Sequence, residues 1–523
     1  MAIYDGITPD LAQFCELAVN RRVIPVRLKV LADSETPVGI YRKLTGSRAG
    51  TFLMESAAVG GAWSRYSFIG VHSRATLTSD DGQACWIGEP PVGAPTSGDT
   101  MEALRGTIDA LATERFENVP PFTSGMVGFI GWDSVRHWEK LPSPPEDDLH
   151  LPELAMNLVS DVAIHDNSDG SVMLVANAIN YDNSPHRVDE AWHDAVSRLH
   201  SMLDRLHSPG NGDIVCPPTA LLSPEKLMSE VRQSWDHAAF MRAIDTCKEA
   251  IVDGEVFQIV ISRRFELSCD APPLDVYRML RSSNPSPYMY LFNFEDRAGA
   301  PYAVVGSSPE ALVTVAGNDV SMHPIAGSRP RSRHAEADRD MAEELLTDTK
   351  ERSEHLMLVD LARNDISRVC VPGSVEVSQF MEVERFSHIM HLVSTVNGEM
   401  SPACSAFDVL AATFPAGTLS GAPKPRALQL LDELEPHRRS VYGGVVGYFD
   451  FAGDMDVAIA IRSALLKDRT AFIQAGAGIV ADSDPESEAA ETLSKAAAPL
   501  RAAYFAHQRA LSKADGTAQT ETL

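Results

Sequence analysis

The amino-acid sequence predicts a mixed α and β fold (α/β or α+β). Apolar or alternating runs of strand length recur along the chain, and between them lie longer segments whose apolar residues have helical spacing. With 523 residues, the chain is too long for one small hydrophobic core. It predicts either two domains or one large compound domain.

In chain order, the first segment (residues 1–207) begins with a short helix and an apolar strand. Two further strand runs follow, and then a loop rich in Gly and Pro. Another pair of strands and a long helix complete this segment. These elements are the helix at 10–20, the strands at 23–30 (VIPVRLKV), 51–56 (TFLMES) and 65–71 (RYSFIGV), the loop at 84–100, the strands at 125–132 and 172–179, and the helix at 186–206.

A stretch rich in Pro, Gly and Ser, SPGNGDIVCPPTALLSPE, makes residues 208–232 the best candidate for a linker. Beyond it, a second segment (233–510) alternates strands with helices. The small, polar residues 511–523 predict a disordered tail. The elements of the second segment are the helices at 235–252, 336–363, 405–413 and 486–508 and the strands at 257–267, 302–306, 311–315, 441–451, 455–466 and 470–480.

Composition excludes several classes of protein. A net charge of −27 and the lack of a Lys/Arg-rich run argue against nucleic-acid binding, although a small anionic substrate remains compatible. The seven cysteines include no CxxC pair, so they predict neither a zinc site nor a disulfide framework. Because no signal pattern and no apolar run near the roughly 20 residues of a membrane span is present, we expect a soluble cytoplasmic protein without a membrane partner.

The segment KERSEHLMLVDLAR (350–363) predicts a helix with an acidic face. Leu356, Val359 and Ala362 recur at helical spacing and are expected to face a core. Glu351 and Glu354 are three residues apart and therefore share one face, where they repel each other unless a positive charge lies between them.

A second helix start, ESEAAETLSKAAAPL, repeats this arrangement with Glu488 and Glu491. A Ser/Asp-rich turn precedes it and can cap the helix. Two such faces could converge on one divalent cation, and carboxylate oxygens suit Mg²⁺. The alternative is that all four glutamates are solvated first-turn residues favoured by the helix dipole.

Two loop-like stretches could bind an anion. In MHPIAGSRPRSR (322–333), Gly327, the Ser328 hydroxyl and the arginines could bind a carboxylate; the alternative is an exposed basic turn. In FPAGTLSGAPKPRA (414–427), small residues permit close backbone approach and Thr418 offers a hydroxyl. This second stretch lacks the spacing of a nucleotide-binding loop.

Glycines interrupt the apolar strands VYGGVVGYF (441–449) and QAGAGIVADSDPE (474–486), which indicates close backbone approach. Arg462 interrupts the apolar run VAIAIRSALL and needs a partner, either a substrate carboxylate or an internal acid. His388 and His391 lie in a predicted strand, where their odd separation places them on opposite faces, so they predict no joint metal site.

Taken together and in this order, the motifs PIAGSRPR, SEHLMLVDLARND, HIMHLVSTVNGE, AGTLSGAPKPRA, YGGVVGYF, IRSALL and GAGIVADSDPESEAAET resemble the chorismate-utilising enzymes. Within that family they are most similar to anthranilate synthase component I. The resemblance covers residues 235–505, with weaker motifs at 50–70. It implies a large two-sheet sandwich with outer helices and an active site in a cleft of the C-terminal part.

The resemblance also implies roles for the motif residues. Mg²⁺ would be held by Glu354 and Glu491, with Glu351 and Glu488 beside them or acting through water, and would bind the ring carboxylate of chorismate. Glu310 matches the general acid that protonates the departing C4 hydroxyl, and His391 a histidine beside the ring. Ser328 and Ser332 stand where the family usually has Thr and Gly. The residues implied in substrate binding are Gly327, Ser328, Thr418, Tyr442, Arg462, Gly476, Ala477 and Gly478, of which Tyr442 and Arg462 would hold the enolpyruvyl carboxylate.

Two positions separate activities within the family. Water-adding relatives have a lysine base where this chain has Gln258, and aminodeoxychorismate synthase has a nucleophilic lysine where it has Ala326. The resemblance therefore implies addition of ammonia at C2 and elimination of pyruvate to give anthranilate. Aminodeoxychorismate synthase component I and a non-catalytic regulatory subunit that binds an amino acid are the alternatives.

Partners follow from the same resemblance. No cysteine lies in the tight Gly-rich turn of a glutamine amidotransferase, so ammonia would come from a separate amidotransferase subunit, in a heterotetramer with this chain. FLMESA (52–57) with NPSPYMYLF (284–292) resembles a site for feedback inhibition by L-tryptophan; the alternative is ordinary core. The residues implied in this site are Glu55, Ser56, Pro287, Tyr288 and Met289.

Overall fold

The structure is a computed structural model that describes residues 6–56, 65–210, 214–215, 222–332, 334–385 and 389–520. His388 lies outside the described residues. The two sequence segments meet in one continuous network of strands, and every ladder between named strands in the described chain is antiparallel. The division at residues 208–232 stays a prediction.

Two sheets share a long ribbon formed by β4 (Tyr66–Asp80) and β7 (Leu154–Asp166). The N-terminal half of β7 pairs with β6 (Gly125–Ile130) and its C-terminal half pairs with β8 (Ser171–Ile179), while β4 follows almost the whole of β7. Register shifts between Gly70 and Ala75 interrupt the β4–β7 ladder, and such irregularities bend strands. The ribbon can therefore pass from one sheet into the other.

The first sheet contains two neighbouring strands that carry much of the candidate site. Strand β10 (Gln258–Ser268) pairs with β22 (Thr470–Ile479) from Ile259 to its C-terminal end. In spatial order this sheet contains β1 (Ile7–Thr8), β2 (Val23–Leu31), β8 (Ser171–Ile179), β7 (Leu154–Asp166), β4 (Tyr66–Asp80), β3 (Phe52–Glu55), β11 (Tyr288–Glu295), β12 (Pro301–Ser308), β21 (Ser463–Lys467), β22 (Thr470–Ile479) and β10 (Gln258–Ser268), with β9 (Arg232–Gln233) and β18 (Gly421–Ala422) pairing on β10.

The second sheet leads from the ribbon to the segment that resembles the substrate loop. Strand β17 lies at its far end and pairs with three neighbours. The sheet contains β5 (Gln83–Gly88), β4, β7, β6 (Gly125–Ile130), β19 (Val445–Asp450), β20 (Met455–Ile459), β13 (Ala311–Ala316), β14 (Asp319–Met322) and β17 (Ile389–Glu399), flanked by β15 (Ile325–Pro330) and β16 (Glu376–Arg385).

An aromatic core fills the space between the two sheets. Phe129 of the second sheet meets Phe294 of the first edge to face, with ring centroids 5.5 Å apart, a preferred geometry for aromatic pairs. Phe68 and Tyr448 join the same cluster of buried side chains. The expected two-sheet sandwich is therefore confirmed.

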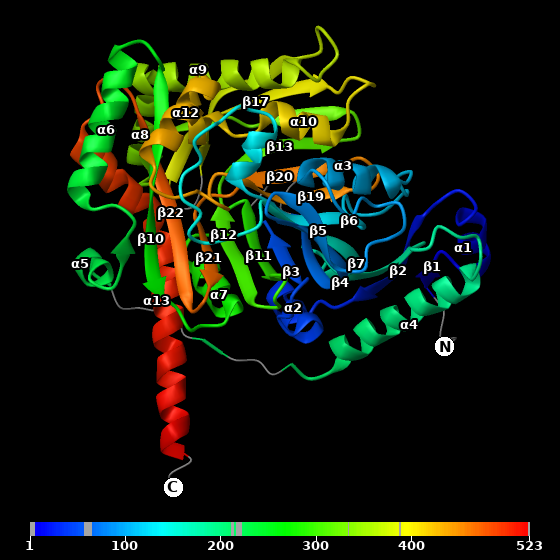
Figure 1. Cartoon of the computed structure of the whole chain (residues 1–523). Coiled ribbons are helices and arrows are strands. Elements are labelled where there is room, and N and C mark those ends of the chain that lie inside the picture. Colours follow the sequence, from blue (N-terminus) through cyan, green and yellow to red (C-terminus); the bar gives the residue numbers. More distant parts are fainter. Residues whose placement is uncertain are drawn as a thin grey trace.

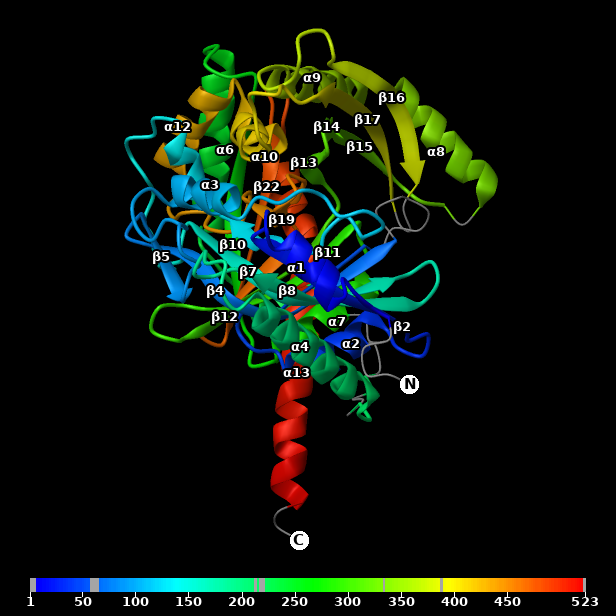
Figure 2. The same ribbon diagram turned by 90° about the vertical axis from the view of Figure 1, so that its right-hand side faces the viewer.

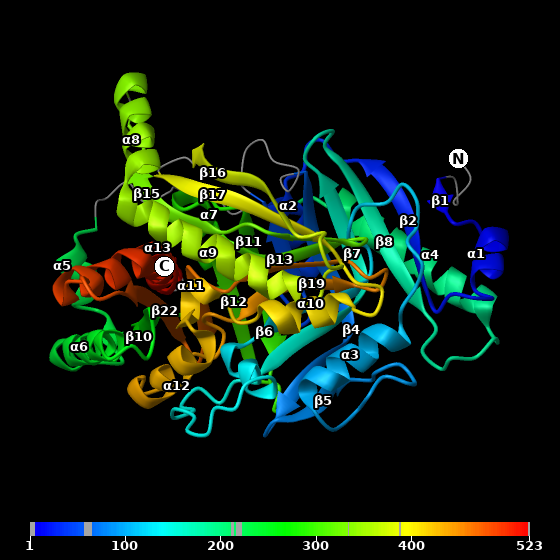
Figure 3. The same ribbon diagram turned by 90° about the horizontal axis from the view of Figure 1, so that it is seen from above.

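Helices cover the outside of the sheets (Figures 1, 2 and 3). In Figure 1, α13 starts within the body and its C-terminal half extends beyond it. The helices are α1 (Leu11–Leu17), α2 (Pro37–Thr45), α3 (Thr100–Ala110), α4 (Val188–His207), α5 (Pro224–Met228), α6 (His237–Val252), α7 (Pro273–Ser283), α8 (Ala335–Thr347), α9 (Thr349–Ser367), α10 (Ala406–Thr413), α11 (Gly417–Ser420), α12 (Lys424–Leu434) and α13 (Pro485–Thr520), with a 3₁₀ helix at Trp132–His137. Among the described residues, no helix is long and apolar enough to cross a membrane.

Three local predictions need correction or comment. The helix expected at 336–363 is two helices, because Asp348 ends α8 and its carboxylate caps α9 by accepting from the Lys350 and Glu351 amides. Val359 and Ala362 are buried as expected, but Leu356 is 52% exposed. Residues 511–520, expected to belong to a disordered tail, continue α13.

Candidate active site

Acidic residues from α9 and α13 face one another. Burial raises the pKa of Glu354, and the nearby carboxylates of Glu351 and Glu491 raise it further. Burial likewise raises the pKa of Glu488, with a further contribution from Glu491. Two helix starts more than a hundred residues apart in the chain therefore place like charges within electrostatic reach of each other.

Only part of this negative charge is neutralised by the chain itself. Lys495 Nζ lies 2.6 Å from Glu491 Oε1, and Arg329 donates to Glu351 Oε1 at 3.2 Å. Glu354 makes no ion pair with any described residue. The described carboxylates do not form a group of three or more arranged around one point, but Mg²⁺ often takes only one or two carboxylates and completes its shell with water and substrate. Glu354 and Glu491 fit that donor set.

Glu310 lies in the turn that follows β12, and its main-chain oxygen accepts from the Ile459 amide at 3.0 Å. Burial raises the pKa of its carboxyl group to about 8, against the opposing effects of the Thr418 hydroxyl, which donates to Glu310 Oε1 at 3.3 Å, and of the Lys495 charge. A cavity of about 390 Å³ reaches both Glu310 and Thr418 and is walled by apolar residues of α9. At neutral pH Glu310 thus carries a proton that it can donate.

His391 of β17 is held by the glycine loop. Its Nδ1 lies 3.0 Å from the Gly327 carbonyl oxygen, and since a carbonyl can only accept, Nδ1 carries the proton. Burial lowers the pKa of His391 and keeps the ring neutral. Gly327 has φ +68°, a conformation that favours glycine. A Cβ there would also lie 3.0 Å from Glu351 Oε2. Ser328 follows at an exposed position of β15.

Arg462 and Tyr442 lie together across the site. The guanidinium of Arg462 makes no hydrogen bond or ion pair with the described residues, although Tyr442 and Glu491 are close enough to act on its charge; burial lowers its pKa. Its φ of +52° is rare for a residue with a side chain and is a form of strain common at functional sites. None of the described residues is therefore the internal acid that the sequence analysis considered as a partner of Arg462.

The glycines of β22 allow neighbouring groups to pack closely against this strand. A Cβ on Gly476 would lie 2.9 Å from both Tyr442 Oη and the Ile261 carbonyl oxygen, and one on Gly478 would lie 2.7 Å from Gln258 Nε2. Ala477, between them, is fully buried in the core, and its role in substrate binding stays a prediction.

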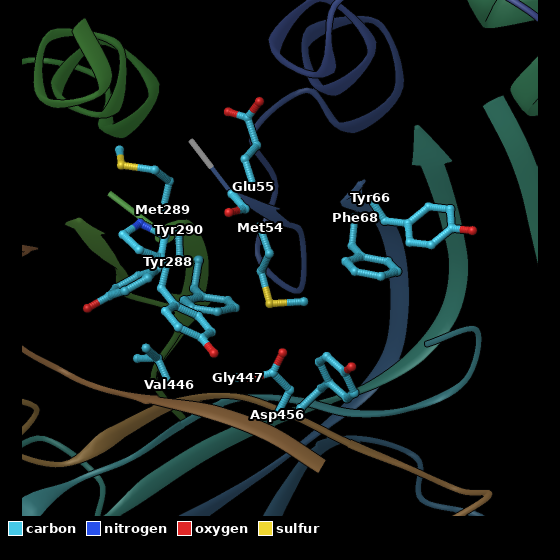
Figure 4. Close-up of a pocket in the computed structure, with 14 residues that line it drawn as sticks. Met54, Glu55, Tyr66, Phe68, Tyr288, Met289, Tyr290, Val446, Gly447 and Asp456 are labelled. Atoms are coloured by element: carbon cyan, nitrogen blue, oxygen red, sulfur yellow. The ribbon is translucent and has the colours of Figure 1, made fainter. Parts of the chain in front are cut away.

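The five residues implied in tryptophan binding line one pocket of about 520 Å³ between β3 and β11 on one side and β19 and β20 on the other (Figure 4). Glu55, however, is already engaged. Its carboxylate accepts from the Tyr277 hydroxyl and from Arg281 Nε, both on α7. In Figure 4 the Glu55 carboxyl group points away from Asp456, which lines the opposite wall.

The two described arginines of MHPIAGSRPRSR, Arg329 and Arg331, form ion pairs within the chain. Arg329 pairs with Glu344, Asp348 and Glu351. Arg331 pairs with Asp338. These ion pairs fix Arg329 and Arg331 against α8, α9 and the turn between them. The binding of a carboxylate by Gly327 and Ser328 stays a prediction.

Sequence reasoning missed Lys495. Its ammonium bridges Glu491 and the Gly476 carbonyl oxygen, which it contacts at 3.1 Å. The signal was present in the sequence, because Lys495 follows Glu491 by four residues on a helix.

Comparisons with known proteins show which family this chain belongs to. Residues 51–501 match the family described as chorismate binding enzyme. Anthranilate synthase component 1 of Arthrobacter globiformis is 67% identical over 96% of this chain and 94% of its own, and that of Mycobacterium tuberculosis (strain ATCC 25618 / H37Rv) is 49% identical over 95% of each. The crystal structure of anthranilate synthase component I from Streptococcus pneumoniae TIGR4 superposes with a TM-score of 0.73 at 32% identity, covering 90% of this chain and 99% of that one. The chain therefore belongs to the chorismate binding enzymes and, within them, to the anthranilate synthase component I family.

Proposed function

We propose that this chain converts chorismate and ammonia into anthranilate and pyruvate with Mg²⁺ as cofactor, and thereby serves tryptophan biosynthesis. One observation carries the proposal. An acidic pair that calls for a cation, Glu354 and Glu491, lies near the Arg462 guanidinium, which makes no hydrogen bond or ion pair among the described residues. Chorismate is a dicarboxylate and needs one positive charge at each end.

Each end of the substrate then has its own residues. Glu354 and Glu491 would hold Mg²⁺, which when bound supplies positive charge to the ring carboxylate. Arg462 and Tyr442 orient the enolpyruvyl carboxylate. Gly476 and Gly478 would let the backbone of β22 approach the ring closely. A Cβ at either position would crowd neighbouring groups of the chain itself.

The proton for the leaving group comes from Glu310. Ammonia adds at C2 while Glu310 protonates the C4 hydroxyl, which leaves as water; loss of the C2 proton and of the enolpyruvyl group as pyruvate gives the aromatic ring. The raised pKa of Glu310 supports this role. His391 stays neutral and positions the ring or moves a proton through the nitrogen opposite Nδ1.

Two residues favour ammonia over other nucleophiles. Gln258 cannot act as the base that activates water. Ala326 of β15 cannot form the covalent intermediate of aminodeoxychorismate synthase. Direct attack by ammonia is the remaining route.

Ammonia would come from glutamine through a separate amidotransferase subunit, in a heterotetramer with this chain. The relatives are named component 1, which supports a second component.

The six cysteines of the described residues are all free, as expected in a reducing cytoplasm. L-Tryptophan would inhibit the enzyme by binding the pocket beside Glu55 and Met289.

The test is anthranilate fluorescence from the purified chain with chorismate, Mg²⁺ and ammonium at alkaline pH. Product that disappears with EDTA and with Glu491→Ala, and falls on addition of L-tryptophan, is the expected result. Consumption of chorismate without anthranilate would favour the sister synthase. No consumption at all would favour a non-catalytic regulatory subunit.

A further inference from the structure

The pocket beside Glu55 contains two buried polar atoms that have no hydrogen-bond partner among the described residues. They are Ser56 Oγ, at the end of β3, and Asp456 Oδ1, on β20. They lie on opposing walls, and the surface between them is largely aromatic and aliphatic, including Phe68 and Tyr448. An unsatisfied buried acceptor costs about 1–3 kcal/mol, so a ligand that supplies a donor at this point binds preferentially.

Asp456 is the carboxylate that remains available in this pocket. The other one, Glu55, accepts from Tyr277 and Arg281 on α7. Two tyrosines face Asp456. The hydroxyl of Tyr288 on β11 forms a hydrogen bond with the Asp456 carboxylate, and Tyr448 on β19 lies opposite Asp456 in the β19–β20 ladder. No cationic side chain lines the described pocket.

We propose that Asp456 determines the specificity of this pocket: its unpartnered oxygen accepts a hydrogen bond from the ring N–H of the inhibitor, while Ser56 binds the amino-acid head group. This inference rests on the proposed inhibition by L-tryptophan. The aromatic surroundings of Asp456 suit an indole ring, and a phenylalanine side chain there would leave the buried oxygen without a donor. Sites built around such a bond reject analogues that lack it.

The protonation of Asp456 gives an independent signature. Burial raises its pKa to about 7, although the Tyr288 hydroxyl opposes this. An N–H donor favours the carboxylate over the carboxylic acid. Inhibition should therefore strengthen as the pH rises from about 6 to 8, a range in which Tyr288 and Tyr448, with pKa values well above 10, stay neutral.

The experiment compares inhibition of ammonium-dependent activity by L-tryptophan and by its analogue with sulfur in place of the ring N–H, 3-(3-benzothienyl)-L-alanine. For the unaltered chain we expect the analogue to be weaker by about tenfold or more, as for loss of a hydrogen bond to a charged group. Asp456→Ala should weaken tryptophan by a similar factor and leave the analogue unchanged. Asp456→Asn keeps an acceptor and should restore part of the difference in inhibition between tryptophan and the analogue. The control Asp319→Ala, at an exposed acid of β14, should behave like the unaltered chain.

The outcomes separate this inference from the proposed regulation. If tryptophan inhibits but the unaltered chain does not distinguish it from the analogue, the role of Asp456 is refuted while feedback inhibition stands. The same holds if Asp456→Ala, with unchanged uninhibited rate, still distinguishes them. If tryptophan neither inhibits nor binds in calorimetry, both are refuted. Should Asp456→Ala fail to fold, the comparison of the two ligands on the unaltered chain still decides.

Discussion

Replacing Glu310 with glutamine should make the protein more stable and almost inactive. The ordinary pKa of a glutamate is 4.5, whereas that of folded Glu310 is about 8, so the folded state binds the proton more tightly than the unfolded chain. Stability from this site is therefore lost as the pH rises from 4.5 through 8. At about 1.4 kcal/mol per pH unit, the loss is about 2 kcal/mol at pH 6 and about 4 kcal/mol at pH 8.

Glutamine is neutral at every pH and keeps an oxygen for the Thr418 hydroxyl, so Glu310→Gln should recover this free energy. Both figures are upper limits, because the side chain is partly exposed and water screens its charge. The essential point is the direction: the gain at pH 8 exceeds the gain at pH 6. Loss of the general acid should lower kcat/KM by about 10²- to 10⁴-fold.

The assay is thermal or urea unfolding at pH 6 and pH 8, together with the anthranilate assay. Glu376→Gln, at an exposed glutamate of β16 without an ion pair among the described residues, is the matched control and should change stability by less than about 0.5 kcal/mol at either pH. A gain that is equal at both pH values, or a Glu310→Gln variant with normal activity, would refute the assignment of a protonated acid.

Three further predictions concern the rest of the site. Arg462→Gln should raise the KM for chorismate by about 10- to 100-fold, as for loss of a charge-assisted hydrogen bond; an unchanged KM would contradict its role. Glu491→Gln should weaken Mg²⁺ binding in calorimetry and raise the Mg²⁺ concentration that restores activity after EDTA, and equal affinity would exclude it as a ligand. Gly476→Ala should lower kcat/KM by at least about tenfold, since its Cβ meets a main-chain oxygen. Gly478→Ala should be milder, since its Cβ meets only the tip of the Gln258 side chain; equal losses would contradict this difference.

Local periodicity predicted much of the fold but not its finer features. The predicted helix at 350–363 is present. Leu356, however, follows the buried His355 by one residue, and one residue turns a helix by roughly 100°. Its side chain therefore points away from the buried face of α9. Hydrophobic periodicity did not predict the break between α8 and α9 at Asp348, because an aspartate is common both within an acidic helix and at a helix cap.

Long-range partners were the least predictable part of the site. The sequence predicted that the arginines of the loop at 322–333 bind an anion. The acidic side chains that Arg329 and Arg331 actually contact come from α8, α9 and the turn between them, and their approach depends on how these helices pack against the loop. In the same way, Met289 and Glu55 face each other across the β3–β11 ladder although more than two hundred residues separate them. Only the resemblance to a family, and not any local pattern, pointed to that pairing.

The antiparallel ladders β3–β11 and β6–β19 join the segment before Ile214 to the segment after it by hydrogen bonds. A shared aromatic core adds to this association. The covalent connection near Ile214, which is 92% exposed, adds little to that association. A single proteolytic cut there would leave two fragments that stay together and separate only in denaturant. For the same reason, a gene divided at this point would encode two polypeptides able to assemble into one catalyst, with the pocket beside Glu55 formed where they join.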